Sequence, residues 1–453
     1  MGDRVVLHYF NGRGKMESIR WLLTVAEVEF DEKFLDTREE YLKLVNDGKL
    51  MFQQVPLVEI DGMKLIQTKA ILNYLAEKYN MHGKDLKDRV MINMYSEGLI
   101  DLMEMIMVLP FNPDPTAKLE EIEKKAKERY LPVFEKALTG PVYLVGGKLS
   151  LADVLLVECT LMLEEKFAGI LKEFSAVKSF QGRMIRIPAI NRFLQPGSKR
   201  KPPPGENYAK AVIEVFQIKA LKNKKKTATT AMSEKPVLYY FNGRGKMESI
   251  RWLLTVAEVE FDEVILTTRE QYEKLLNDGA LMFQQVPLVE MDGMKLIQTK
   301  AILNYIAEKY NLHAKDPKER VMINMYSEGL IDLMEMIMIL PFTPDPKPKL
   351  DNIQSKAKER YLPVYEKALT GPVYLVGGKL SLADVLLVEC TLMLEEKFPD
   401  ILKDFPNIKS FQGRMTQIPA ISRFLQPGSK RKPPPDEKYL KNVVEVLNLK
   451  LPL

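Results

Sequence analysis

The chain has few cysteines and histidines, and the first candidate for a catalytic side chain is a tyrosine at the end of a predicted strand. Tyr9 closes the apolar run 4–10, and Lys15 follows an Asn-Gly-Arg-Gly turn where a helical pattern begins. A neutral hydroxyl donor beside a helix amino terminus, with a cation nearby, would suit a bound thiolate. Lowering a thiol pKa by about two units takes about 2.7 kcal/mol of interaction. Taken alone, Tyr9 equally fits a strand-end aromatic with a solvated hydroxyl, and Lys15 a surface charge.

Several other kinds of chemistry are excluded by composition. Two cysteines and three histidines cannot make a disulfide framework or a Cys-rich zinc site, and they leave little for metal binding. Glu17 stands where a dinucleotide-binding fingerprint needs its third glycine, and no phosphate-loop Gly-Lys-Ser/Thr occurs. The first strand does not end in Cys-x-x-Cys, which excludes dithiol redox chemistry. We therefore expect neither a metal nor a bound cofactor.

Composition indicates an ordinary globular protein. The chain has 453 residues, of which 46% are hydrophobic and 28% charged, and a formal net charge of only +5. This charge is too small to indicate a nucleic-acid or membrane partner. No apolar signal core and no apolar run of membrane-spanning length occurs, so we expect a cytoplasmic protein.

The strongest feature of the sequence is an internal repeat. Asn11 to Phe30 recurs letter for letter at Asn242 to Phe261, and the shift of 231 residues holds to the end of the chain. About 175 of 222 aligned positions are identical, which indicates a duplicated protein and not a solenoid unit. Residues 223–231 are polar and basic and are typical of a linker. Because Met232 stands where a second initiator would, read-through of two neighbouring genes is an alternative origin of the fusion.

Each copy divides into an α/β part and a helical part. In the first copy the patterns predict strands at 4–10, 30–35, 55–60 and 63–66, and helices at 15–28, 39–46 and 68–79. After Lys84 only helices are expected, at 89–107, 118–138, 151–165, 177–186 and 208–218. Ser150 and Asp153 have the spacing of a capping box. The predicted domains are 1–83 and 84–222 in the first copy, and 232–314 and 315–453 in the second.

This organisation and several local motifs resemble the alpha class of the cytosolic glutathione transferases. The motifs are Tyr-Phe-Asn-Gly-Arg-Gly-Lys-Met-Glu-Ser-Ile-Arg-Trp at 9–21, Met-Phe-Gln-Gln-Val-Pro at 51–56, Asp-Gly-Met-Lys-Leu-Ile-Gln-Thr at 61–68 and Phe-Leu-Gln-Pro-Gly-Ser at 193–198. The resemblance covers nearly all of both copies and leaves out only the linker. It implies a thioredoxin-like domain followed by an all-helical domain, repeated twice, with cis peptide bonds at Val55-Pro56 and Val286-Pro287.

The resemblance also assigns roles to particular residues. It gives Tyr9 and Tyr240 the contact with the glutathione sulfur, and it places Lys15 and Lys246 where many members carry arginine. The residues implied to bind glutathione are Gln54, Val55, Gln67, Thr68, Asp101 and Arg129, with Gln285, Val286, Gln298, Thr299, Asp332 and Arg360 in the second copy. Asp101, Arg129 and their counterparts would reach glutathione bound to the other subunit. Taken alone, they would be surface charges, and Thr68 a helix N-cap.

The pocket for the electrophile and the dimer contact are implied by position in the same way. The pocket walls would be Phe10, Gly12, Met107, Val108, Phe111 and Phe216, and in the second copy Phe241, Gly243, Met338, Ile339, Phe342 and Leu447. The terminal helices would act as lids, and because their residues differ we expect the two pockets to prefer different electrophiles. Phe52 and Phe283 match the aromatic key of the family's dimer.

One departure from the family pattern concerns glutathione affinity. Val45 and Leu276 stand where alpha-class members usually have an arginine that contacts the glycyl carboxylate. Losing a charge-assisted contact of roughly 1.5–3 kcal/mol predicts a Michaelis constant for glutathione raised by one to two powers of ten, unless Lys43 or Lys274 compensates.

The expected function is therefore conjugation of glutathione to hydrophobic electrophiles, with glutathione as cosubstrate. Organic hydroperoxide reduction and steroid double-bond isomerisation are further activities that the resemblance implies. The alternative is a non-catalytic, ligandin-like protein that binds hydrophobic molecules. We expect the two copies to pair within one chain, or copies on two chains to pair with each other.

Overall fold

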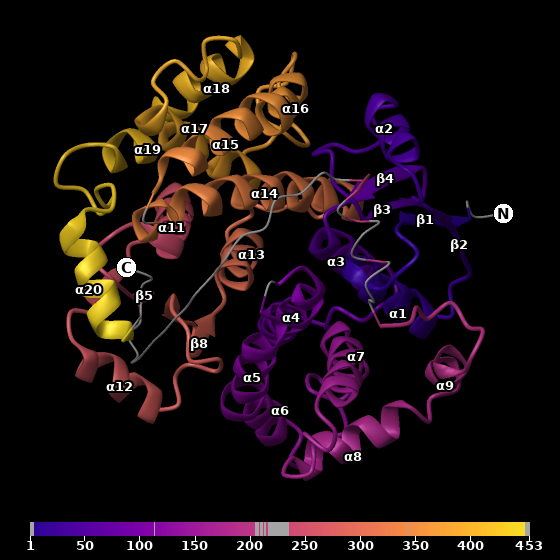
Figure 1. Ribbon diagram of the computed structural model, residues 1–453. Helices are drawn as coiled ribbons and strands as arrows, with labels where there is room; N and C mark the ends of the chain where they lie inside the picture. Colours follow the sequence, from indigo (N-terminus) through magenta and orange to yellow (C-terminus); the bar gives the residue numbers. More distant parts are fainter. Residues whose placement is uncertain are drawn as a thin grey trace. The chain divides into compact units, whose positions relative to one another are not determined.

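Two similar units make up the chain. The computed structural model describes residues 4–112, 114–203, 208, 212, 214, 215, 235–343 and 345–448. The chain divides into the compact units Met1–Lys222 and Asn223–Leu453, which repeat one order of strands and helices (Figure 1). The tandem repeat predicted from the sequence is confirmed. The predicted linker, 223–231, lies outside the described residues.

A four-stranded mixed sheet opens each unit. In the first, β1 (Val5–Tyr9) pairs in parallel with β2 (Phe30–Phe34) and antiparallel with β3 (Leu57–Ile60), and β3 pairs antiparallel with β4 (Met63–Ile66). The strand order β2-β1-β3-β4 therefore places Tyr9 at the end of an inner strand. The second sheet has the order β6-β5-β7-β8, from β5 (Val237–Tyr240), β6 (Asp262–Ile265), β7 (Leu288–Met291) and β8 (Met294–Ile297).

The helices of the sheet domain connect these strands. They are η1 (Gly14–Met16), α1 (Glu17–Val25), α2 (Arg38–Asn46) and α3 (Thr68–Lys78), with η4 (Gly245–Met247), α11 (Glu248–Val256), α12 (Arg269–Asn277) and α13 (Thr299–Lys309) in the second unit. Helix α1 packs against α3 and also against α7 and α9 of the helical domain. In this contact Trp21 meets Phe193 edge to face, with ring centroids 5.1 Å apart. Helix α1 thus joins the two domains of its copy.

The helical domain begins with α4, which packs along α7 (Figure 1). Its elements are α4 (Leu86–Met107), η2 (Leu109–Phe111), α5 (Pro115–Lys125), the π-helical turn η3 (Ala126–Tyr130), α6 (Leu131–Ala137), α7 (Leu151–Lys166), α8 (Ser175–Met184) and α9 (Pro188–Leu194). The second unit has α14 (Pro317–Met338), η5 (Leu340–Phe342), α15 (Lys347–Lys356), η6 (Ala357–Tyr361), α16 (Leu362–Ala368), α17 (Leu382–Lys397), α18 (Pro406–Thr416), α19 (Pro419–Phe424) and α20 (Glu437–Leu447).

The predicted capping box at the start of α7 is confirmed. Asp153 is fully buried and accepts hydrogen bonds from the backbone N–H groups of Leu144 and Ser150, both at 2.9 Å, and from Ser150 Oγ at 2.6 Å. The side chain therefore fixes both the helix start and the loop before it.

The fold class expected from the sequence is confirmed, with local differences. The strand expected at 55–60 begins at Leu57. The peptide bonds Val55-Pro56 and Val286-Pro287 are cis, as the family resemblance implied. The helix expected at 118–138 contains a π-helical turn, and α9 was not anticipated. Of the helix expected at 208–218, only a few residues are described. Its counterpart in the second copy is α20. Among the described helices, none has the length and apolarity needed to cross a membrane.

Candidate active site

The hydroxyl of Tyr9 lies where β1 meets the start of the following helix. The side chain is 7% exposed, and its hydroxyl accepts a hydrogen bond from the backbone N–H of Lys15 at 3.0 Å. In the second copy Tyr240 accepts the same bond from Lys246 at 3.1 Å. Because this N–H belongs to the first turn of a helix, the hydroxyl lies in the positive field of the helix terminus. The geometry suits a phenol that donates its own proton to an anion.

A glycine makes this approach possible. Gly14 has φ of +44°, and a Cβ at this position would lie 2.4 Å from the hydroxyl of Tyr9. Gly245 stands in the same relation to Tyr240. A larger residue would be strained in its backbone and would displace the tyrosine hydroxyl.

The side chain of Lys15 reaches the helical domain of its own copy. Its Nζ lies 2.7 Å from Glu104 Oε1 on α4, and both side chains are substantially exposed. Lys246 and Glu335 repeat the contact at 2.6 Å. Exposed ion pairs contribute only about 0–1 kcal/mol. The lysine therefore adds positive charge near the tyrosine, but a carboxylate offsets much of it.

The residues expected to bind glutathione in the sheet domain lie together. Gln67 Nε2 donates to Gln54 Oε1 at 3.0 Å, and the hydroxyl of Thr68 donates to the backbone oxygen of Lys15 at 3.4 Å. Val55 lies in the bend between Gln54 and β3. The pair Gln298–Gln285 and the contact of Thr299 with Lys246 repeat these distances, and Val286 takes the place of Val55. One continuous set of contacts thus extends from the tyrosine to the start of α3.

Helix α3 begins at Thr68, which was considered above as a possible N-cap residue. The N-cap residue is Gln67, with φ of +66°, and Thr68 is the first helical residue. Reading Thr68 as a plain N-cap was therefore wrong. Free backbone N–H groups at this helix terminus suit a carboxylate.

Asp101 and Arg129 lie in the helical domain. Asp101 is half-buried on α4, and Arg129 is buried with its guanidinium 5.0 Å from the ring centroid of Tyr130. In the second copy Asp332 and Arg360 are half-buried. Burial raises the pKa of the adjacent Tyr361 to about 12, with Asp332 adding to the rise. The predicted reach of these residues to a glutathione on the other copy stays a prediction.

Of the walls expected for the electrophile pocket, Phe10 is in contact with Tyr9. Phe10 meets the ring of Tyr9 at 5.3 Å between centroids, Met107 ends α4, and Val108 beside it is 48% exposed. Phe111 lies on η2. Phe216 lies outside the described residues. In the second copy the corresponding residues are Phe241, Gly243, Met338, Ile339 and Phe342, with Leu447 at the end of α20.

A tyrosine that was not anticipated from the sequence covers this site. The hydroxyl of Tyr208 is hydrogen-bonded with that of Tyr9, and its ring lies edge-on to Phe10 at 6.4 Å. The ring lies so close to Gly12 that a Cβ there would be 2.3 Å from it. Tyr439 on α20 makes the same contacts with Tyr240 and Gly243. A tyrosine stands at this position in both copies, and this was the signal in the sequence that could have pointed to it.

Two further residues beside the site, Arg13 and Arg20, were also missed. Arg13 forms two hydrogen bonds to the carboxylate of Glu165 on α7, at 2.6 and 3.0 Å. Arg20 is fully buried and bridges Glu17 and Glu32. Buried charges are normally paired in this way. These pairs hold the start of α1 in place within the sheet domain and against the helical domain.

The remaining predicted positions belong to the expected dimer contact and to helices α2 and α12. Phe52 and Phe283 are fully buried, and their role as dimer keys stays a prediction. Val45 is half-buried on α2 beside the exposed Lys43, and Leu276 lies similarly beside Lys274. The described residues contain no group of three or more His, Cys, Asp or Glu side chains placed to hold a metal ion.

Comparison with known proteins shows the family of the chain. The model for the glutathione S-transferase N-terminal domain matches residues 5–77 and 236–308, and that for the C-terminal domain matches 99–188 and 330–419. Glutathione S-transferase 3 of Gallus gallus is 58% identical over 222 residues, which cover 48% of this chain and 97% of the relative. Glutathione S-transferase A4 of Mus musculus is also 58% identical, over 48% of this chain and 99% of the relative. Glutathione S-transferase A1 of Homo sapiens is 54% identical over the same shares. The chain belongs to the glutathione S-transferase family and comprises two tandem copies of an alpha-class-like enzyme.

Proposed function

We propose that each copy joins the thiolate of glutathione to a hydrophobic electrophile. The observation that carries this proposal is the position of the Tyr9 hydroxyl, which accepts a hydrogen bond from the Lys15 N–H and has one proton that it can donate. A phenol that accepts one hydrogen bond becomes a better donor of another. A thiolate at this position would therefore be stabilised by the hydroxyl and by the helix terminus together.

The peptide part of glutathione would be held by the contacts around α3. The N–H groups at the start of α3 suit the carboxylate of the γ-glutamyl end. The backbone at Gln54 and Val55 would pair with the cysteinyl part, and the Gln67–Gln54 hydrogen bond holds the two segments in register. The sulfur would then lie at Tyr9 and face the pocket wall at Phe10 and Met107.

The reaction itself needs no further group from the protein. The thiol proton leaves to solvent, the sulfur electron pair forms a C–S bond, and a halide departs with its bonding electrons. With a Michael acceptor, the resulting carbanion takes a proton from water. The protein contributes the thiolate population and the approach of the two reactants.

Replacing both catalytic tyrosines tests the proposal. With a chromogenic aryl halide, Tyr9→Phe with Tyr240→Phe should lower kcat/KM at neutral pH by about one to two orders of magnitude, because one to two units of thiol pKa are lost. The spectrally determined pKa of bound glutathione should rise by the same amount. Unchanged turnover and an unchanged thiol pKa in the double variant would contradict the proposed role.

The same thiolate could serve two related reactions, which we also propose. Attack on an organic hydroperoxide would give the alcohol and a sulfenic derivative of glutathione, and a second glutathione would convert this to the disulfide and water. Isomerisation of a steroid double bond would need the thiolate only as a base. Coupled assays for disulfide formation and for the shifted double bond would test these reactions separately.

A non-catalytic binding function is the second candidate. It is favoured by the contact of Tyr208 with Tyr9, because this contact occupies the hydroxyl that turnover needs. Saturable binding of hydrophobic ligands without turnover of the aryl halide would favour this candidate over the enzyme.

We further propose a cytoplasmic protein in which copies pair through Phe52 and Phe283, either within one chain or between two chains. Native mass at low concentration separates these arrangements, because the single chain has a mass of 52.0 kDa and a two-chain assembly about twice that. Cell fractionation with an antibody to residues 223–231 would test the location and show whether the fused chain exists.

A further inference from the structure

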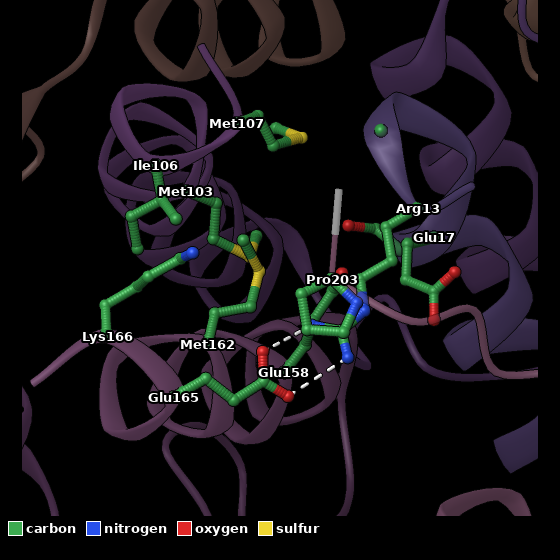
Figure 2. A pocket seen from close by; sticks show the side chains of 12 residues that line it. Arg13, Glu17, Met103, Ile106, Met107, Glu158, Met162, Glu165, Lys166 and Pro203 are labelled. Atoms are coloured by element: carbon green, nitrogen blue, oxygen red, sulfur yellow. Dashed lines mark hydrogen bonds and ion pairs between the residues drawn. The ribbon is translucent and has the colours of Figure 1, made fainter. Parts of the chain in front are cut away.

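A cavity beside the catalytic tyrosine of the first copy has a polar inner wall. It is a small recess, partly open to solvent, between the start of α1, the end of α4 and α7 (Figure 2). Its apolar lining comes from Met103, Ile106, Met107 and Met162. Flexible methionine side chains adapt to ligands of varied shape.

The cavity adjoins the proposed electrophile pocket. Gly14 lies on its edge, and this glycine is in close contact with the hydroxyl of Tyr9. Met107 belongs both to this cavity and to the pocket wall expected from the sequence. A molecule that reacts at the glutathione sulfur could therefore extend into the cavity.

The polar group of the inner wall is the carboxyl of Glu158. The side chain is 4% exposed and lies in the middle of α7. Ser18 is hydrogen-bonded to it from the first turn of α1. Among the described residues, no group lies within hydrogen-bond distance of Glu158 Oε2. Such an unpartnered atom is costly, at about 1–3 kcal/mol, unless a ligand satisfies it.

The charges around Glu158 come from three directions. Glu17 on α1 is paired with Arg20, and Arg13 in the turn before α1 is paired with Glu165. Arg200, from the segment after α9, also contacts Glu165. These neighbours pair with one another, whereas Lys166 of α7, which also lines the cavity, adds a further positive charge.

Burial determines the protonation state of this carboxyl. It raises the pKa of Glu158 to about 8, with the charge of Glu17 adding to the rise and Ser18, Arg13 and Arg200 opposing it. The group is therefore mostly neutral at pH 7. Since Ser18 donates to one oxygen, the proton is expected on Oε2, where no described residue accepts it.

We propose that this cavity is a binding subsite for the carbonyl oxygen of a neutral, hydrophobic molecule, with the protonated Glu158 as hydrogen-bond donor. The proposal adds to the transferase function a chemical feature of the electrophile, namely a carbonyl oxygen. Binding at the subsite does not depend on that function, but the claim that the bound molecule reacts with glutathione does. Ether and hydroxyl oxygens share this acceptor chemistry more weakly. Glu158 is thus a specificity-determining residue that does not touch the reacting sulfur.

The second copy carries the same residues. Glu389 is 3% exposed, has an unpartnered Oε2 and is hydrogen-bonded by Ser249. Burial raises its pKa to about 8 as well. The counterparts of the four apolar lining residues are unchanged, as Met334, Ile337, Met338 and Met393. We therefore expect the same preference from both copies, even though their lids differ.

A matched pair of probes tests the subsite without turnover. 4-Fluoroacetophenone and 4-fluoroethylbenzene have nearly the same shape, but only the ketone has a carbonyl acceptor, and fluorine NMR reports the binding of each. At about pH 6.5 the full-length protein should bind the ketone about fivefold more tightly, as expected for one net hydrogen bond. At about pH 9.5, above the pKa of Glu158, the preference should largely disappear because a carboxylate only accepts hydrogen bonds.

Three double variants separate Glu158 from other donors. Glu158→Gln with Glu389→Gln keeps a donor and should prefer the ketone at both pH values. Glu158→Met with Glu389→Met removes the donor and should show no preference at either. Tyr74→Phe with Tyr305→Phe removes one tyrosine hydroxyl per copy outside the cavity lining and should bind both probes as the unmodified protein does.

Two results of these binding measurements would contradict the proposed role of Glu158. Equal affinity for the two probes at the lower pH, or a preference that survives in the methionine variant, would overturn the proposal. If the methionine variant does not fold, a preference in the unmodified protein that does not change with pH would overturn it equally. Aryl-halide turnover is measured separately, so loss of the subsite and loss of the transferase function remain distinguishable.

Discussion

The tyrosine that covers the active site should compete with glutathione. The hydroxyl of Tyr208 is hydrogen-bonded with that of Tyr9, and each phenol has only one proton to donate. Tyr439 and Tyr240 form the same pair. Burial raises the pKa of Tyr208, and its contact with Tyr9 raises it further, so the group remains a neutral phenol. If glutathione binds as proposed, its sulfur has to displace this hydroxyl to reach Tyr9.

Removing only the two covering hydroxyls isolates their effect. Tyr208→Phe with Tyr439→Phe keeps the rings, which lie edge-on to Phe10 and Phe241 at 6.4 and 6.5 Å. A net intramolecular hydrogen bond contributes about 0.5–1.5 kcal/mol. Since that bond would no longer have to be broken, the Kd for glutathione should fall about fivefold.

Calorimetric titration with glutathione measures this change directly. Tyr74→Phe with Tyr305→Phe is a matched control, because it removes a tyrosine hydroxyl from each copy at a hydrogen bond to Asp61 or Asp292, away from Tyr9. The control should bind glutathione as the unmodified protein does. An unchanged or weaker affinity in the Tyr208 variant would refute the competition and would instead give its hydroxyl a part in binding.

Three further predictions concern the lid, the fold and the cosubstrate. Asn442 on α20 donates a hydrogen bond to the backbone oxygen of Thr267 at 3.0 Å, and its counterpart in the first copy is Ala211. Asn442→Ala should therefore speed hydrogen exchange in α20 about fivefold. Unchanged protection would show that this hydrogen bond is unimportant for the helix. Asp153→Ala leaves two buried N–H groups unpaired and should lower the free energy of unfolding of the first copy by about 3 kcal/mol. Urea unfolding measures this change, and a decrease below about 1 kcal/mol would contradict the prediction. Val45→Arg with Leu276→Arg should lower the Michaelis constant for glutathione about tenfold or more, whereas an unchanged constant would mean that the missing arginine is irrelevant.

Local sequence patterns predicted the elements that carry the site. The apolar run before Tyr9, the glycine-containing turn and the helical spacing after Lys15 are all short-range signals, and each was found where expected. The capping box of Ser150 and Asp153 is another local signal. The π-helical turn at 126–130 has no comparable signature, because it continues the helical pattern of its neighbours.

Contacts between distant segments could not be predicted in this way. Tyr208 reaches Tyr9, and Arg13 reaches Glu165, only because the helical domain folds back on the sheet domain. Spacing along the chain says nothing about such pairs. Glu158 was detectable as a lone acid between Val157 and Cys159 in an apolar helix, but its unpartnered oxygen and the adjoining cavity appear only in three dimensions.

The thiolate absorbance of bound glutathione tests the proposed chemistry most directly. At neutral pH, ultraviolet difference spectra of the full chain saturated with glutathione should show about two thiolates per chain if each copy lowers the thiol pKa as proposed. Tyr9→Phe alone, or Tyr240→Phe alone, should leave about one, and the double variant almost none. A full thiolate signal in the double variant, or no signal in the unmodified chain despite saturating binding, would contradict two active sites that each depend on a strand-end tyrosine.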